Sequence, residues 1–122
     1  MRAQLHGIYS EELDLNRVLP ADRYRSYFHA VMTVGPDNGP GEETFQVTVC
    51  TPAWLAEEAS VRGPIVGRHL LIVEPMDANR AVRALRQNVE AAEGRTWAEV
   101  AEKVSRIGLW EFEDYQEHPG AE

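Results

Sequence analysis

The stretch TWAEVAEKVSRIGLWEFEDY, residues 96–115, predicts a helix and a strand that the rest of the chain must cover with an apolar surface. In its first half, apolar side chains recur at steps of three and four residues, which predicts an amphipathic helix. Thr96 and Glu99 have the spacing of a capping box that starts a helix, and Gly108 predicts its end. Residues 109–115 then alternate between apolar and acidic side chains, as in a strand with one buried face. Both elements therefore need an apolar surface to pack against.

The N-terminal residues 3–9 (AQLHGIY) alternate and predict a first strand with a glycine inside it. Regular alternation places Ala3, Leu5 and Tyr9 on one side of the strand and Ile8 on the other. We therefore expect Tyr9 to face the same way as Leu5.

Three further stretches predict strands. In the second half of residues 24–34 (YRSYFHAVMTV), odd-numbered and even-numbered positions are both apolar, which predicts a strand that is covered on both faces or lies at an interface. Residues 44–50 (TFQVTVC) alternate and predict the second strand of a hairpin, with Phe45 and its alternate neighbours facing the core. The continuous apolar run within residues 67–74 (GRHLLIVE) predicts a central strand.

Two more helices are predicted, one over residues 51–63 with Thr51 as its cap and one over residues 77–92 with Asp77 as its cap. The predicted fold class is α+β. An antiparallel sheet of about five strands carries two or three helices on one face, because this arrangement buries the apolar stripes of the helices most simply.

Length and charge indicate a single acidic domain. The 122 residues fit one domain over 1–122, with residues 116–122 as a frayed tail. Twenty Asp and Glu against 12 Lys and Arg give a net charge of −8, which repels nucleic acid and anionic membrane surfaces and attracts cationic partners. The same charge also serves solubility alone.

The sequence predicts a cytoplasmic protein. It contains no run of about 20 apolar residues, which a membrane span requires, and its N-terminus lacks the apolar run of a signal peptide. The single cysteine, Cys50, cannot form an intrachain disulfide, and its position within a predicted strand favours a buried thiol.

No spacing of the four histidines indicates a metal site, and we expect no metal and no cofactor. His29 and His69 lie on predicted strands and can be neighbours in space. An alternative is therefore a small cytosolic α+β enzyme or metabolite-binding domain that uses Cys50, His29 and His69.

The last predicted strand has an acidic face. Glu111 and Glu113 fall opposite Trp110 and Phe112, so that together with Asp114 they can meet a basic protein surface. An ordinary edge strand with its charges toward water explains the same pattern. Carboxylates between aromatic residues argue against binding of single-stranded nucleic acid, which needs basic residues there.

Several motifs together resemble one known family. CTPAWL at 50–55, GPIVGRHLLIV at 63–73 and GRTWAEVAEKVSRIGLWEFEDY at 94–115 are similar to the Immunity protein 8 family of bacterial polymorphic toxin systems. AQLHGIYS at 3–10 and the Gly-Pro pair at 35–36 lie where that family has similar segments. The resemblance covers nearly the whole chain, and the fit is looser at residues 10–25 and at the tip of the hairpin.

The resemblance implies a cytosolic protein that is not an enzyme and that binds and blocks one cognate toxin. It implies no catalytic residues. For the binding surface we predict Glu111, Glu113 and Asp114, with Glu42 and Glu43 at the hairpin tip as a second group. A regulatory domain that binds another protein is a third hypothesis, and the doubly apolar strand leaves a homodimer open.

Overall fold

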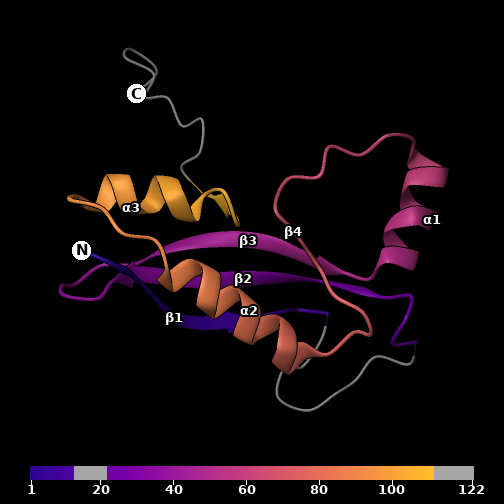
Figure 1. The fold of residues 1–122 in the computed structure, drawn as a ribbon, viewed down its shortest axis with the longest axis horizontal. Helices are drawn as coiled ribbons and strands as arrows, with labels where there is room; N and C mark the ends of the chain where they lie inside the picture. Colours follow the sequence, from indigo (N-terminus) through magenta and orange to yellow (C-terminus); the bar gives the residue numbers. More distant parts are fainter. Residues whose placement is uncertain (13–21, 112–122) are drawn as a thin grey trace.

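Five strands and three helices make up the protein in a computed structural model that describes residues 1–12 and 22–111 (Figure 1). This is the predicted α+β class. None of the helices in these two ranges is long and apolar enough to cross a membrane. The elements are β1 (Ala3–Tyr9), β2 (Tyr27–Pro36), β3 (Glu43–Cys50), α1 (Pro52–Arg62), β4 (Leu70–Ile72), α2 (Ala78–Glu90), α3 (Trp97–Val104) and β5 (Leu109–Trp110).

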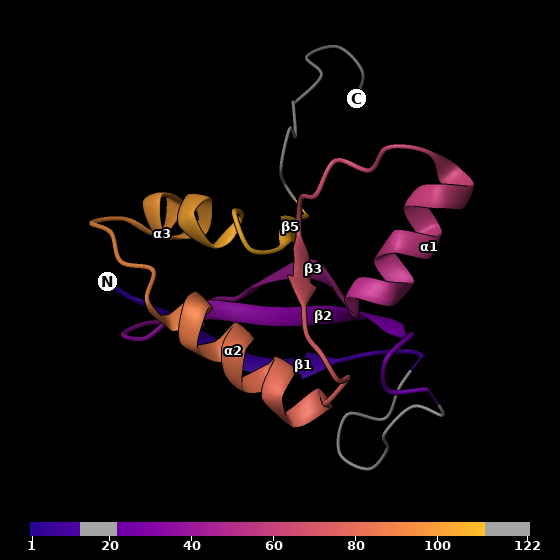
Figure 2. The same cartoon turned by 45° about the vertical axis from the view of Figure 1, so that its right-hand side comes forward.

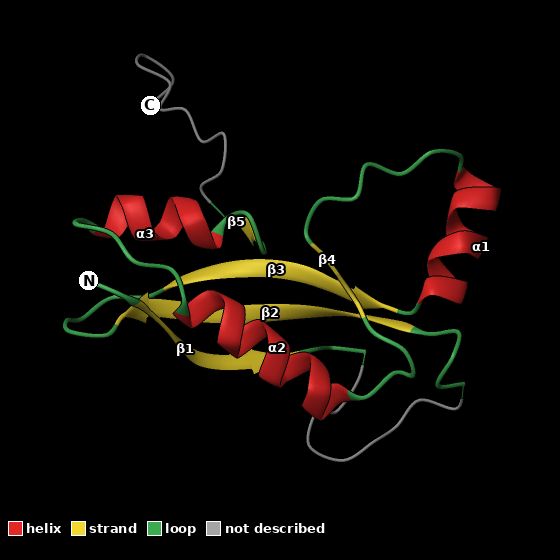
Figure 3. Cartoon of the chain, viewed as in Figure 1, coloured by secondary structure: helices red, strands yellow, loops and turns green. Residues whose placement is uncertain are grey.

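The first three strands run antiparallel in the order β1-β2-β3, and two short strands share the outer edge of β3 (Figure 3). β4 pairs parallel to one end of β3, and β5 pairs antiparallel to the other end. The strand predicted over residues 67–74 is confirmed for Leu70–Ile72, but its predicted central position is wrong, because these three residues pair at the edge of the sheet. The strand predicted over 109–115 is confirmed for Leu109 and Trp110 but ends there, because Glu111 lies in a turn. Residues 112–115 lie outside the described ranges.

A register shift in β1 changes the direction in which its last residues face. Leu5 and Gly7 pair with consecutive residues of β2, so β1 holds one extra residue at this point. Ile8 consequently packs against the core, and Tyr9 pairs with Val31 on the opposite face, where it is 54% exposed. The expected common face of Leu5 and Tyr9 is wrong because the bulge reverses the alternation.

Helices α2 and α3 cover one face of the sheet, as Figures 1 and 2 show. Their predicted apolar stripes are confirmed, and each helix begins at its predicted cap, Asp77 or Thr96, whose side chain accepts a backbone N–H of the first turn. The core between helices and sheet contains Leu5, Phe28, Ala30, Met32, Val34, Phe45, Val47, Val49, Ala81, Leu85, Val89, Val100, Ala101 and Val104.

The opposite face of the sheet keeps its side chains exposed or half-buried. In β2, Phe28, Met32 and their alternate neighbours are buried, whereas Tyr27 and His29 are exposed. The prediction that this strand is covered on both faces is therefore wrong within the described residues. Helix α1 buries none of its residues and lies beyond the end of the sheet (Figure 1), where Trp54 stacks on Tyr27 with ring centroids 4.6 Å apart.

Helix α2 also closes the outer edge of β1. The Leu5 backbone N–H donates to the Glu90 carboxylate at 3.0 Å, and the Arg86 guanidinium donates to the Leu5 carbonyl at 3.0 Å. The Ala3 N–H donates to the Ala92 carbonyl at 3.0 Å. These contacts occupy groups that would otherwise be a template for pairing with another strand.

Gly108 lets the turn between α3 and β5 lie directly against the sheet. An added Cβ at Gly108 would lie 2.9 Å from Met32 Cε and 3.1 Å from Phe45 Cβ. Gly108→Ala should therefore lower the free energy of unfolding by about 1–3 kcal/mol, the usual cost of overpacking a core. Urea denaturation measures this value.

The control for this substitution is Gly39→Ala, because a Cβ at Gly39 would meet no atom within 4 Å. Its free energy of unfolding should stay within about 0.5 kcal/mol of the parent. Equal values for the two variants would contradict the close packing assigned to Gly108.

Candidate functional site

The uncovered face of the sheet is the candidate site, and we call it the open sheet face. Its centre is a row across three strands, in which Val31 pairs with Tyr9 on one side and with Gln46 on the other. His29 and Thr48 pair in the adjacent part of β2 and β3. The open sheet face comprises Tyr9, Tyr27, His29, Val31, Gln46 and Thr48.

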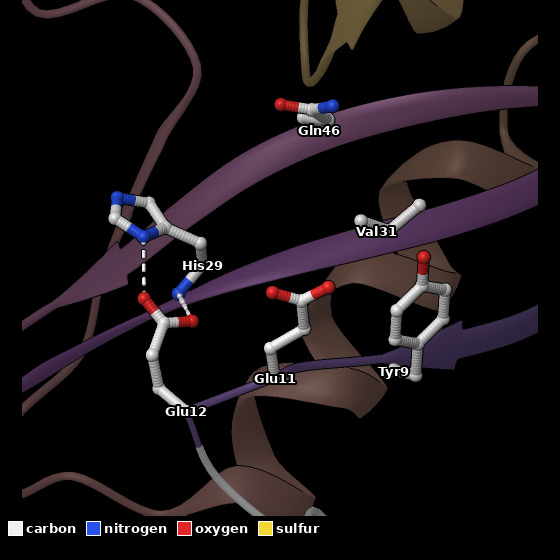
Figure 4. A pocket seen from close by; sticks show the side chains of 6 residues that line it. All are labelled: Tyr9, Glu11, Glu12, His29, Val31 and Gln46. Atoms are coloured by element: carbon white, nitrogen blue, oxygen red, sulfur yellow. Dashed lines mark hydrogen bonds and ion pairs between the residues drawn. The ribbon is translucent and has the colours of Figure 1, made fainter.

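Glu12 holds His29 in place at the edge of this face. The pairing of β1 with β2 ends at Tyr9 and Val31, so β1 provides no partner for the backbone of His29. The Glu12 carboxylate takes this role, because it accepts the His29 backbone N–H at 3.2 Å and the ring Nδ1–H at 2.6 Å (Figure 4). One side chain thus fixes both the strand and the orientation of the imidazole.

The pKa of Glu12 reflects this contact. Partial burial raises the pKa of the carboxyl, but the hydrogen bonds from His29 outweigh burial, and the pKa lies below its ordinary value. Glu12 is therefore ionised at neutral pH.

A hollow of about 590 Å³ lies on the open sheet face. Its lining residues are Tyr9, Glu11, Glu12, His29, Val31 and Gln46 (Figure 4). Two smaller hollows adjoin it through His29. One, of about 230 Å³, also reaches Arg68, His69 and Leu109, and the other, of about 340 Å³, reaches Trp54 and Ile65 beside α1. The face is therefore hollowed over much of its length.

Exposed apolar side chains also occur at the α1 end of this face. Tyr27 lies on the face and is 41% exposed, and Ile65, which lines the hollow beside α1, is 40% exposed. Val61 in α1 and Val66 in the segment that follows are 80% and 82% exposed. Single exposed apolar residues are common, but several within one part of a chain are typical of an interaction surface.

The structure places Glu111, the described member of the first predicted acidic group, beside the second group at the hairpin end of the sheet. The Glu42 carboxylate accepts the His6 Nδ1–H at 2.9 Å, and Glu43 accepts the indole N–H of Trp97. Glu111 accepts the backbone N–H of Thr44 at 3.2 Å, directly after Glu43 in the chain. This contact depends on the pairing of β5 with β3, which joins two segments that are far apart in the sequence.

Glu113 and Asp114, the other two predicted binding residues, lie outside the described residues. Of the three described carboxylates, those of Glu42 and Glu43 also line a hollow of about 610 Å³ at the hairpin tip. Each of the three makes a hydrogen bond within the chain, so they support the hairpin end as well as giving it negative charge.

The alternative enzyme site is only partly assembled. His29 and His69 line the same 230 Å³ hollow, but Cys50 is not among its lining residues. The Cys50 side chain is fully buried, and burial raises the pKa of its thiol, which lowers the fraction of reactive thiolate. The His69 ring donates its Nε2–H to the Ser105 carbonyl at 2.8 Å. Residues 1–12 and 22–111 contain no cluster of three His, Cys, Asp or Glu that could hold a metal ion.

Sequence reasoning missed Tyr9, Glu11 and Glu12 as site residues. Regular alternation assigned Tyr9 to the face of Leu5, and the two glutamates belong to a polar segment without periodicity. Gly7 was the available signal, because an isolated glycine within a strand pattern often marks a bulge.

Comparison with known proteins identifies related sequences at the level of a family. A family model described as Immunity protein 8 matches residues 3–115, a range that contains every described helix and strand. Comparisons with curated proteins and with solved structures found no match.

The contact between Glu12 and His29 predicts a pH-dependent contribution to stability. The Glu12 pKa is lower in the folded chain than its ordinary value of 4.5, so the ionised carboxylate stabilises the fold above that value. This contribution is lost as the pH falls through the folded pKa. Glu12→Gln should therefore lower the free energy of unfolding by about 1 kcal/mol at pH 7, and the difference should shrink below the ordinary pKa.

Urea denaturation of the parent and the variant at neutral and acidic pH measures the effect. Glu11→Gln is the matched control, since Glu11 is exposed and makes no hydrogen bond or ion pair with another described residue. It should leave stability nearly unchanged at both pH values. A Glu12→Gln effect that stays equally large in acid would contradict the assigned linkage.

Proposed function

The chain belongs to the Immunity protein 8 family, and from this premise we propose that it binds one cognate toxin protein in the cytoplasm and neutralises it. The family places the chain among the immunity proteins of polymorphic toxin systems and indicates a role that is not enzymatic. We propose three further points: that the chain binds a toxin, that it does so in the cytoplasm, and which surface of the chain makes the contact.

The uncovered sheet face is the observation that supports a protein partner. One face of the sheet is packed by α2 and α3, whereas the other is hollowed and carries exposed aromatic and apolar side chains. A partner that covers this face would bury Tyr9, Tyr27 and Leu109, which are now between 41% and 54% exposed. Apolar burial of this kind is the main driving force of protein association.

Negative charge supports a toxin with a basic contact surface. The chain has a net charge of −8, and the proposed acidic contact comprises Glu42, Glu43, Glu111, Glu113 and Asp114. Complementary charge accelerates association and suppresses binding of other acidic proteins. A toxin that acts on nucleic acid has such a basic surface, although blockage away from its active centre would also neutralise it.

Neutralisation is tested with the toxin domain whose gene adjoins the gene for this chain. Cells that express this domain alone should stop growing, and cells that also express the chain should grow. The purified proteins should form a complex on size-exclusion chromatography. Growth arrest in both cultures, with both proteins present, would overturn the proposed function.

Charge reversal tests the acidic contact. Glu42→Lys with Glu111→Lys should weaken toxin affinity by about tenfold or more and reduce its dependence on salt, because two carboxylates at the proposed contact become cations. Isothermal titration calorimetry at two salt concentrations measures both quantities.

The control is Glu57→Lys with Glu102→Lys, which changes net charge by the same amount at exposed positions of α1 and α3. Its affinity should change by less than about threefold, since long-range steering alone is affected. If both pairs weaken binding equally, net charge and not the proposed acidic contact decides affinity.

A further inference from the structure

We propose that the 590 Å³ hollow on the open sheet face receives an arginine side chain of the partner. The identity of the partner rests on the proposed function, whereas the chemistry of the hollow rests on its own residues. The assignment concerns Tyr9, Glu11 and Gln46, which the acidic contact at the hairpin end does not include.

The charge of the lining selects a cation. The six lining residues include two carboxylates and neither lysine nor arginine. The Glu12 carboxylate already accepts two hydrogen bonds from His29. Glu11, in contrast, has no hydrogen bond or ion pair with any residue in the described ranges, so none of these residues competes with a ligand for its carboxylate.

The other lining groups fit a guanidinium better than an ammonium ion. In Figure 4 the Glu11 carboxylate lies beside the Tyr9 ring on the β1 side of Val31, and the Gln46 amide lies on the β3 side. An aromatic ring attracts a cation through its face, and a planar guanidinium stacks on such a ring while its five N–H groups remain free to donate. The Glu11 carboxylate, the Gln46 amide oxygen and the Tyr9 hydroxyl are the acceptors available to them.

The hollow is formed before a partner arrives. The bulge in β1 directs Tyr9 onto the open sheet face, and pairing with Val31 keeps it there. Glu12 bonds both the backbone and the ring of His29, which fixes the opposite wall. Because α2 occupies backbone groups along the outer edge of β1, strand addition at Leu5 is blocked, and a partner is directed to the face of the sheet.

The test is a titration of the ¹⁵N-labelled full chain that needs no toxin. N-acetyl-arginine amide is added while amide resonances are followed by NMR, and N-acetyl-citrulline amide serves as the neutral isostere. We expect saturable shifts at Tyr9, Val31 and Gln46 with the arginine compound and at least fivefold weaker binding of the citrulline compound. N-acetyl-lysine amide should also bind more weakly than the arginine compound.

Two variants assign the effect to the hollow. Glu11→Gln should reduce affinity for the arginine compound at least fivefold, whereas Glu102→Gln, at an exposed position of α3, should leave it unchanged. The amide spectrum of each variant confirms that the chain remains folded. Absence of saturable shifts in the parent, equal binding of the arginine and citrulline compounds, or equal loss in both variants would overturn the proposal.

The same variants separate this proposal from the proposed function. With the toxin domain, Glu11→Gln should weaken affinity about tenfold relative to Glu102→Gln. If the parent chain neutralises the toxin but Glu11→Gln binds it as tightly as Glu102→Gln does, the arginine site fails and the immunity function stands. If the arginine compound binds but the chain does not neutralise the toxin, the immunity function fails and the site stands.

Discussion

One-sided burial of the sheet is the constraint on which the rest of the structure depends. Three antiparallel strands place Phe28, Met32 and Phe45 on the face that α2 and α3 cover, and all three side chains are at most 1% exposed. Both helices direct their apolar stripes to this face. Because α1 buries none of its residues and lies beyond the sheet, the second face receives no comparable cover among the described elements.

Polar side chains bond backbone groups at the edges of the sheet, which apolar packing alone would leave without partners. Arg86 and Glu90 of α2 bond the outer edge of β1, and Glu12 bonds the edge of β2 where β1 ends. Buried and half-buried backbone groups require such partners, because an unpaired group costs free energy comparable to a lost hydrogen bond. Closure of these edges also directs recognition to the face of the sheet and away from strand addition.

The carboxylates of this protein therefore have two roles. Glu43 and Glu111 bond groups within the chain and at the same time contribute to a negative hairpin end. Glu11 makes no such contact with a described residue and faces a hollow with an aromatic wall. In the proposed complex, the acidic hairpin end would govern the rate of association, whereas the hollow would recognise one particular side chain.

The sequence by itself determined the α+β class, the three helices with their caps and the core stripe of β3. These features depend on the spacing of apolar residues and on capping side chains, which act within a few residues. The tertiary structure alone decided that the strand within residues 67–74 is a short edge strand, that Tyr9 faces away from Leu5 and that Glu111 lies beside Thr44. These outcomes depend on which strands pair along the edge of β3 and on the register in which strands pair. Register is the alignment of residues that are distant in the sequence, and one extra residue in a strand reverses the face of the side chains that follow in that strand.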